Sequence, residues 1–371
     1  HLSGPSVDGL CAWRAQHCPP EADCRGVAPY SDPSRISASF CIFLLLRNET
    51  ACEDITVFRM FQKRSIMKKP VLFLIFNRPE TTFRVFEAIR AYQPEDLFIA
   101  ADGPRPHVST DAARCAEVRT VAEKVDWRCR VHTLFHEKNM GCRYGVADGI
   151  TWFFDQIEEG IILEDDCLPS PDFFRFCEEM LERYRDNEKV MHIGGTNFQD
   201  GIMRGDGSYY FSMIPHIWGW ASWRRAWEKY DVNMTDFPEY IRSGGLADFM
   251  PGHPYIQWRF QLLFRKTYEK SPYFNTWDYQ WHYAVVKNKG LTVIPNYNLV
   301  SNIGESGTHT VASTLCHLPC QRLPERILPP SDINMNSDAD LYSFAKFYRG
   351  SWKDYVRYCF SYLFLKTGEK K

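Results

Sequence analysis

Several features that mark common classes of protein are missing from this sequence. No apolar run approaches the ~20 residues that a helix needs to cross a membrane, so we expect no membrane-spanning helix. The formal net charge is only −2, so the composition gives no reason to expect a nucleic-acid partner. The 13 cysteines contain no Cys-x-x-Cys pair and show no regular spacing. We therefore expect reduced thiols rather than zinc ligands or disulfide bonds.

The start of the chain differs in composition from the rest. Segment 1–66 begins with His1, carries five of the 13 cysteines and shows no helical or strand period. Met67 then leads directly into an apolar run, as the start of a bacterial protein often does. We interpret 1–66 as a non-native or disordered extension, 67–315 as the main domain and 316–371 as a C-terminal extension. A small cysteine-rich appendage is the alternative for the first segment.

Short apolar runs alternate with amphipathic segments from residue 71 onward. Strands are predicted at 71–76, 97–101, 130–135 and 161–163, with helices at 81–91, 109–124 and 144–157 between them. This alternation predicts an α/β fold with a mostly parallel central sheet flanked by helices. The residues that follow parallel strands gather at one edge of such a sheet, where ligands bind.

Three consecutive acids follow the fourth predicted strand. Glu164, Asp165 and Asp166 would repel one another unless a cation lies between them. A divalent metal with oxygen ligands, Mg²⁺ or Mn²⁺, is the simplest such cation, and it commonly arrives with phosphate groups. A solvent-exposed acidic turn is the alternative interpretation.

The other strand ends are also polar. Asn77 and Arg78 follow the first strand and Asp102 follows the second, so we expect all three at the edge that carries the acids. Together these exits suit a nucleotide-sized ligand. Arg143 precedes the helix predicted from Tyr144 and is placed either to meet a phosphate or to lie on the surface.

Four tryptophans lie within ten residues further along the chain. Trp220, Trp223 and Trp227 have helical spacing, and we predict that they form one core-facing stripe of a helix. Trp218 and Gly219 precede that helix and are candidates for a sugar pocket, because the C–H faces of sugars stack on aromatic rings.

Two later segments carry further candidate residues. Asp278 lies at the start of a predicted helix, where it is either a catalytic acid or a carboxylate that compensates the helix dipole. The Gly/Ser-rich loop 301–309 resembles a mobile flap, with His309 as a phosphate or metal contact or simply a solvated side chain.

The last 31 residues, from Leu341 to Lys371, mix aromatic with basic side chains. This pattern suits a helix that rests on a membrane surface. Packing of the same side chains back onto the main domain is the alternative.

The order of these motifs resembles that of the GT-A glycosyltransferases. The acids followed by Pro171-Asp172-Phe173-Phe174 resemble the metal motif of the N-acetylglucosaminyltransferase I type, and uncharacterised bacterial sugar transferases of this fold are closer still. Other segments match in order: Asn77-Arg78, Asp102, Trp218-Gly219-Trp220, Trp277-Asp278 and Gly307-Thr308-His309. In that family two acids follow the tryptophan and the second is the base, whereas Tyr279 follows Asp278 here.

The resemblance implies a GT-A (nucleotide-diphospho-sugar transferase) fold and a metal-dependent, inverting transferase. The enzyme would move a sugar from a nucleoside diphosphate sugar, UDP-linked, to a hydroxyl of a glycan or lipid-linked acceptor. It implies that Asp166 binds Mn²⁺ or Mg²⁺ and that Asp278 is the catalytic base. The residues expected at the donor are Asn77, Arg78, Asp102, Arg143, Glu164, Asp165, Trp218, Gly219 and His309. A bacterial polysaccharide enzyme of this kind would be cytoplasmic, or peripheral on the inner face of the membrane.

Two other functions remain open from the sequence. A nucleotidyltransferase that makes an activated sugar also uses an α/β sheet and acids, but it needs a Gly-rich basic loop after the first strand, and segment 77–80 is not Gly-rich. A non-catalytic carbohydrate-binding protein would use the tryptophans and would have no need of the three acids. Fold class alone does not separate these functions.

Overall fold

The computed structural model describes residues 68–270, 274–304 and 316–368, with side chains up to residue 360. Our interpretation of segment 1–66 and the contact expected of His309 lie outside the described residues. Within the described residues no helix is both long enough and apolar enough to span a bilayer.

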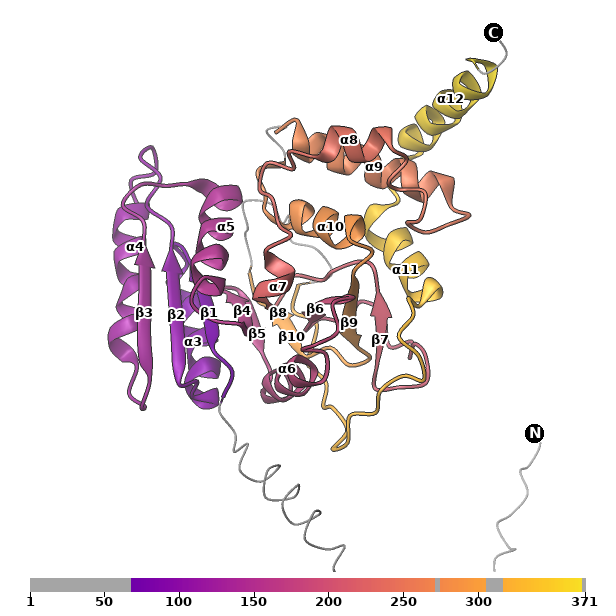
Figure 1. Cartoon of the computed structure of the whole chain (residues 1–371). Coiled ribbons are helices and arrows are strands. Elements are labelled where there is room, and N and C mark those ends of the chain that lie inside the picture. Colours follow the sequence, from indigo (N-terminus) through magenta and orange to yellow (C-terminus); the bar gives the residue numbers. More distant parts are fainter. Residues whose placement is uncertain (1–67, 271–273, 305–315, 369–371) are drawn as a thin grey trace, which may run out of the picture. The chain divides into compact units, whose positions relative to one another are not determined.

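An eight-stranded sheet forms the centre of the fold (Figure 1), with the strand order β3-β2-β1-β4-β8-β6-β9-β7. The strands are β1 Val71–Ile75, β2 Asp96–Ala101, β3 Arg130–Phe135, β4 Glu159–Glu164, β6 Val190–Gly194, β7 Tyr209–Ser212, β8 Trp220–Trp223 and β9 Leu291–Pro295. Strands β7 and β8 run opposite to the other six. A separate antiparallel pair joins β5, Cys167–Pro169, to β10, Val300–Asn302. The prediction of a mostly parallel central sheet is confirmed.

The chain reverses its direction of travel across the sheet between β1 and β4. From β1 it moves outward through β2 to β3, and then returns to place β4 on the other side of β1. In the register, Val71 of β1 pairs with Leu97 of β2 on one side and with Ile161 of β4 on the other. The exits of β1 and β4 are therefore neighbours, and ligands of open α/β sheets bind at such a reversal.

Helices cover both faces of the sheet. They are α3 Pro79–Tyr92, α4 Asp111–Arg119, α5 Gly141–Phe154, α6 Pro171–Arg183, α7 Arg224–Trp227, α8 Phe237–Arg242, α9 Pro254–Tyr268, α10 Asp278–Lys287, α11 Ser337–Ser343 and α12 Trp352–Gly368. Alternate residues of β1 enter different apolar clusters: Phe73 packs with α3 and α6, and Leu72 with α5 and α10. Strand side chains alternate between faces, so this sheet is buried on both sides, as an apolar β1 requires.

The tryptophan-rich segment is not the single helix that its spacing suggested. Trp220 and Trp223 are the two ends of β8, and only from Arg224 does the short helix α7 begin. Residues three apart in a strand point to opposite faces, so Trp220 joins the cluster of Trp277 while Trp223 joins the other. The prediction of one helical stripe was wrong, although the expected core burial holds for both side chains and for Trp227.

The segment that follows residue 315 packs on the sheet through its first part. Leu323, Ile327 and Phe344 belong to the same apolar cluster as the strands. Helix α11 contacts β7, where the buried Asp340 accepts hydrogen bonds from the Ser212 hydroxyl and, at 2.9 Å, from the Met213 amide. Burial raises the pKa of Asp340 from 3.8 to about 7, against the opposing effect of these two donors.

We expect the Asp340→Asn variant to lose a pH dependence of stability that the wild type shows. The folded protein holds a proton on Asp340 that the unfolded chain releases between pH 3.8 and about 7, so wild-type stability falls as pH rises through this window. The contribution is on the order of 4 kcal/mol. Denaturant unfolding across this pH range measures it, with the exposed Asp338→Asn on the same helix as control. Parallel profiles for wild type and Asp340→Asn would contradict the prediction.

Candidate functional site

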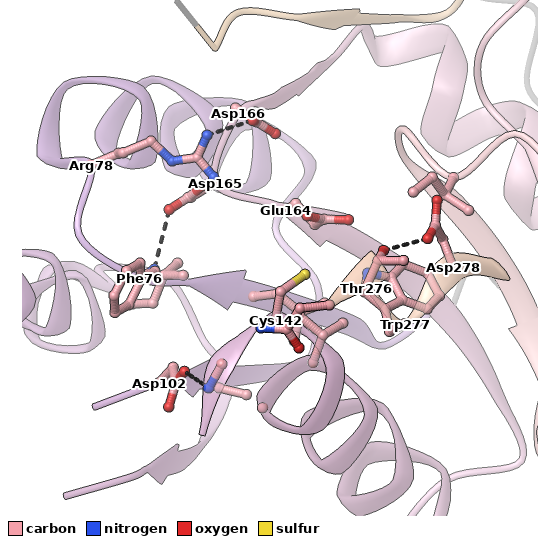
Figure 2. A pocket seen from close by; sticks show the side chains of 18 of the residues that line it. Phe76, Arg78, Asp102, Cys142, Glu164, Asp165, Asp166, Thr276, Trp277 and Asp278 are labelled. Carbon is pink, nitrogen blue, oxygen red and sulfur yellow. Dashed lines mark hydrogen bonds and ion pairs between the residues drawn. The ribbon is translucent and has the colours of Figure 1, made fainter. Parts of the chain in front are cut away.

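A cavity of about 550 Å³ lies at the exits of β1 and β4. This volume falls in the range of ~300–1,000 Å³ that is common for small-molecule sites. Its walls come from both strand exits, from the start of α5 and from the start of α10 (Figure 2). Polar side chains in the wall include Arg78, Asp102, Glu164, Asp165, Asp166 and Asp278. The sequence thus predicted most of the charged residues that the fold brings together here, but not the uncharged polar ones.

The cation between the acids is a guanidinium. Arg78 Nη2 lies 2.7 Å from Asp165 Oδ1, and Arg78 Nη1 lies 2.6 Å from Asp166 Oδ2. The Phe76 amide donates a further hydrogen bond of 3.1 Å to Asp165 Oδ2. Burial by itself would lower the pKa of Arg78, but the charges of Asp165, Asp166 and Glu164 outweigh it and raise that pKa. The sequence predicted that the three acids need a cation between them. Arg78 supplies one positive charge, which pairs with Asp165 and Asp166.

The acids do not by themselves form a complete metal site. Among the described residues no three His, Cys, Asp or Glu side chains converge as metal ligands. Mg²⁺ is commonly held by one or two carboxylates together with phosphate oxygens and water. Asp166, with only 14% of its side chain exposed, provides a carboxylate of this kind in the cavity wall. The donor set therefore fits a divalent metal that binds together with a phosphate ligand.

Glu164 lies between the Arg78 group and Asp278 (Figure 2). Among the residues that the structure describes, no donor forms a hydrogen bond with its carboxylate. Burial raises the pKa of Glu164, the charge of Asp166 raises it further, and Arg78 opposes both. Burial also raises the pKa of Asp165. A protonated Glu164 would offer both a donor and an acceptor to a ligand hydroxyl.

Asp278 is the first residue of α10 and faces the cavity from the side opposite Arg78 (Figure 2). The Thr276 hydroxyl and the Tyr279 amide, at 2.9 Å, both donate to Asp278 Oδ1. These bonds fix the orientation of the carboxylate. The side chains of Cys142 and Thr276, which the sequence did not single out, line the same part of the cavity.

Asp102 lines the cavity but is already fully engaged. Its carboxylate accepts four hydrogen bonds, from the amides of Gly103, Met140 and Gly141 and from the Asn139 side chain, at 2.8–2.9 Å. A carboxylate has about four acceptor positions. Asp102 therefore holds the start of α5 in place, and accepting a bond from a nucleotide base would require one of these donors to leave.

Asn77 acts through a neighbour. Its side chain donates at 2.8 Å to the buried Asp111, which also pairs with Arg105 at 2.6 Å. Hydrogen bonding to Arg105 lowers the pKa of Asp111 to about 2. Asn77 is not among the cavity-lining residues, whereas Arg105 is. The sequence analysis did not identify Arg105 as a site residue. The signal available was its place just after the second strand exit at Asp102.

The structure does not bring Arg143 to the cavity wall. Only 3% of the residue is exposed, and its Nη2 donates to the carbonyls of Thr267 and Phe274, both at 2.8 Å. The expectations of a phosphate contact and of a surface position are both replaced by a structural role. Arg143 ties α5 to the end of α9 and to the cavity wall at Phe274.

Trp218 and Gly219 have different roles. Trp218 is half-buried in the cavity wall and packs edge-on against Phe198, with ring centroids 5.4 Å apart. Gly219 is not among the lining residues. It has φ of +67°, and an added Cβ would lie 2.8 Å from Val300 Cγ2, so the backbone there requires glycine.

Comparisons with known proteins add little to this geometry. No model of a protein family matches the chain, and no curated protein matches it. The solved structures that match include UDP-glucose pyrophosphorylase complexed with UDP-glucose, at 15% identity and a TM-score of 0.24. That alignment covers 44% of this chain and 71% of the other. A likeness at this TM-score does not show a shared function.

We expect Arg143→Met to destabilise the fold and to leave ligand affinity unchanged. The variant leaves one buried and one partly buried carbonyl without their donor, which costs about 2–4 kcal/mol. Denaturant unfolding checks the stability, and titration of a nucleoside diphosphate at a temperature where the variant is folded checks the affinity. Arg242→Met, at an exposed arginine of α8, is the control. Lost affinity with full stability would return Arg143 to the phosphate role.

Proposed function

We propose that this chain is a glycosyltransferase that moves a sugar from a nucleoside diphosphate sugar, UDP-linked, to a hydroxyl of a glycan or lipid-linked acceptor. One observation carries the proposal. A single cavity at the β1–β4 exits has the guanidinium of Arg78 with Asp165 and Asp166 at one end, the fixed carboxylate of Asp278 at the other, and Glu164 between them. The resemblance of these segments to GT-A glycosyltransferases supports the same assignment.

The end of the cavity with Arg78 suits the donor. A diphosphate is an anion, and among the described residues the guanidiniums of Arg78 and Arg105 are the cations that line this cavity. Asp166 would hold the divalent metal, which when bound neutralises charge on the leaving diphosphate. Before the donor binds, Arg78 would stabilise the acids of the metal site. After the donor binds, it would stabilise the phosphates.

The other end suits the attacking hydroxyl. Asp278 would accept the proton of the acceptor hydroxyl while the oxygen of that hydroxyl bonds to the anomeric carbon of the donor sugar. The bond from that carbon to the diphosphate oxygen breaks, and the nucleoside diphosphate leaves with the bonding electron pair. A single displacement of this kind inverts the anomeric centre. Glu164, between the two ends, would bind a sugar hydroxyl, because burial favours its protonated form.

Replacing Asp278 by asparagine is expected to abolish transfer while donor affinity stays at the wild-type level. The amide cannot accept the proton, so turnover falls about 10²–10⁴-fold. Release of nucleoside diphosphate measures turnover, and calorimetry with the donor measures affinity. Asp338→Asn removes a first-turn acid from α11 instead and is the matched control. Wild-type turnover in Asp278→Asn would remove this residue as the base, and release of pyrophosphate would favour a nucleotidyltransferase.

In Asp166→Asn the metal-dependent part of donor binding should disappear. A ligand that binds only the folded state raises the melting temperature, so each nucleotide sugar is screened with and without Mn²⁺. The wild type should show a larger shift with Mn²⁺ for one donor, and the variant should show none beyond its metal-free shift. Asp155→Asn, an exposed acid outside the cavity, serves as the control. A shift with free glycans and no metal would instead support a carbohydrate-binding protein.

A further inference from the structure

The aromatic and basic end of the chain divides into two parts at Gly350. The part before it is held by the domain: Phe344 is buried in the main apolar cluster, and the Arg259 side chain donates to the Tyr348 carbonyl at 2.9 Å. Gly350 has φ of +75°, and α12 begins two residues later at Trp352. Packing onto the domain thus describes the whole first part of this segment, but only one side of α12.

Helix α12 displays a concentrated apolar surface. Trp352 is 73% exposed, Phe360 59%, Tyr355 53% and Val356 39%. Trp352, Val356 and Phe360 are spaced by four residues, so they form one stripe along the helix, with Tyr355 beside it. No other segment of the described residues has so many exposed large apolar side chains so close in sequence.

The other sides of α12 have different surroundings. Tyr358 faces the domain, where its ring lies 5.3 Å from Tyr255 and 5.8 Å from Trp258 of α9. The ring of Tyr355, although the residue is 53% exposed, also packs on Tyr255, at 5.2 Å. Lys353 and Arg357 are both exposed and follow Trp352 and Val356 by one residue each, which places a basic stripe next to the apolar one. Figure 1 shows α12 starting near α9 and leading away from it.

The negative charge on this helix lies near its base. Asp354 accepts hydrogen bonds from the Ser351 amide and hydroxyl, both at 2.9 Å, and lies 3.5 Å from Arg357. Asp354 therefore fixes the start of α12 and leaves the basic stripe with a net positive charge.

We propose that the exposed face of α12, formed by Trp352, Val356 and Phe360, binds the surface of a membrane that contains anionic lipid. Interfacial helices combine such an apolar face with flanking Lys and Arg, and Trp and Tyr suit the boundary between headgroups and acyl chains. Lys353 and Arg357 add attraction to anionic headgroups. A second copy of the chain would bring the same basic stripe toward this one, and like charges oppose that contact.

The test is sedimentation of the full chain with vesicles of phosphatidylcholine plus phosphatidylglycerol, compared with phosphatidylcholine alone. Binding should be much stronger with the anionic vesicles. Trp352→Ser and Phe360→Ser should each lower the partition coefficient about tenfold or more, because the lost side chain no longer leaves water. Lys353→Gln with Arg357→Gln should lower it on the order of tenfold, with the loss suppressed at high salt.

Met203→Ser is the matched control, since Met203 is 52% exposed and lies outside α12. It should bind vesicles as the wild type does, and the melting temperatures of all variants should stay close together. Equal binding of wild type and Trp352→Ser would overturn the proposal. So would an oligomer in light scattering that Trp352→Ser dissolves, because the face would then join two copies. This inference does not depend on the proposed function, and vesicle binding can succeed or fail whatever the transfer assays show.

Discussion

The pocket depends on one positive charge, the guanidinium of Arg78. It pairs with Asp165 and Asp166, so it ties the exit of β1 to the exit of β4 at the place where the sheet reverses. Without that cation the three acids would share a poorly solvated site, and they would either repel one another or take up protons. The fold holds the backbone of Arg78 in place, because Arg78 is the last residue of the turn after β1 and Pro79 is the first residue of α3.

The sequence was informative wherever a local pattern determined the outcome. The ends of the strands that lead to Arg78, Asp102 and the acids were predicted to within about two residues, because buried parallel strands are short apolar runs that end in polar residues. The position of Asp278 at a helix start was also confirmed. These residues meet because β-strand exits share one edge, a property that follows from the α/β alternation alone.

Other parts depended on tertiary contacts that no local pattern encodes. Trp220 and Trp223 fit a helical spacing as well as a short strand, and pairing with β4 and β6 decided for the strand. Arg143 could not be distinguished from a phosphate-binding arginine, because its two acceptors lie more than 100 residues away in the sequence. Asp102 was recognised as a site residue, but its three donors from the turn before α5 were not.

The buried bonds of Arg143 also bear on how the protein is made. The four parallel strands β1 to β4 are complete once residue 164 has been synthesised. At that point the Arg143 guanidinium has no acceptor, because Thr267 and Phe274 have not yet left the ribosome. A charge without partners is costly to bury, so the nascent half cannot close over α5 in its final position. The native packing of α5 has to wait for the chain to reach Phe274, and the cavity is completed only late in translation.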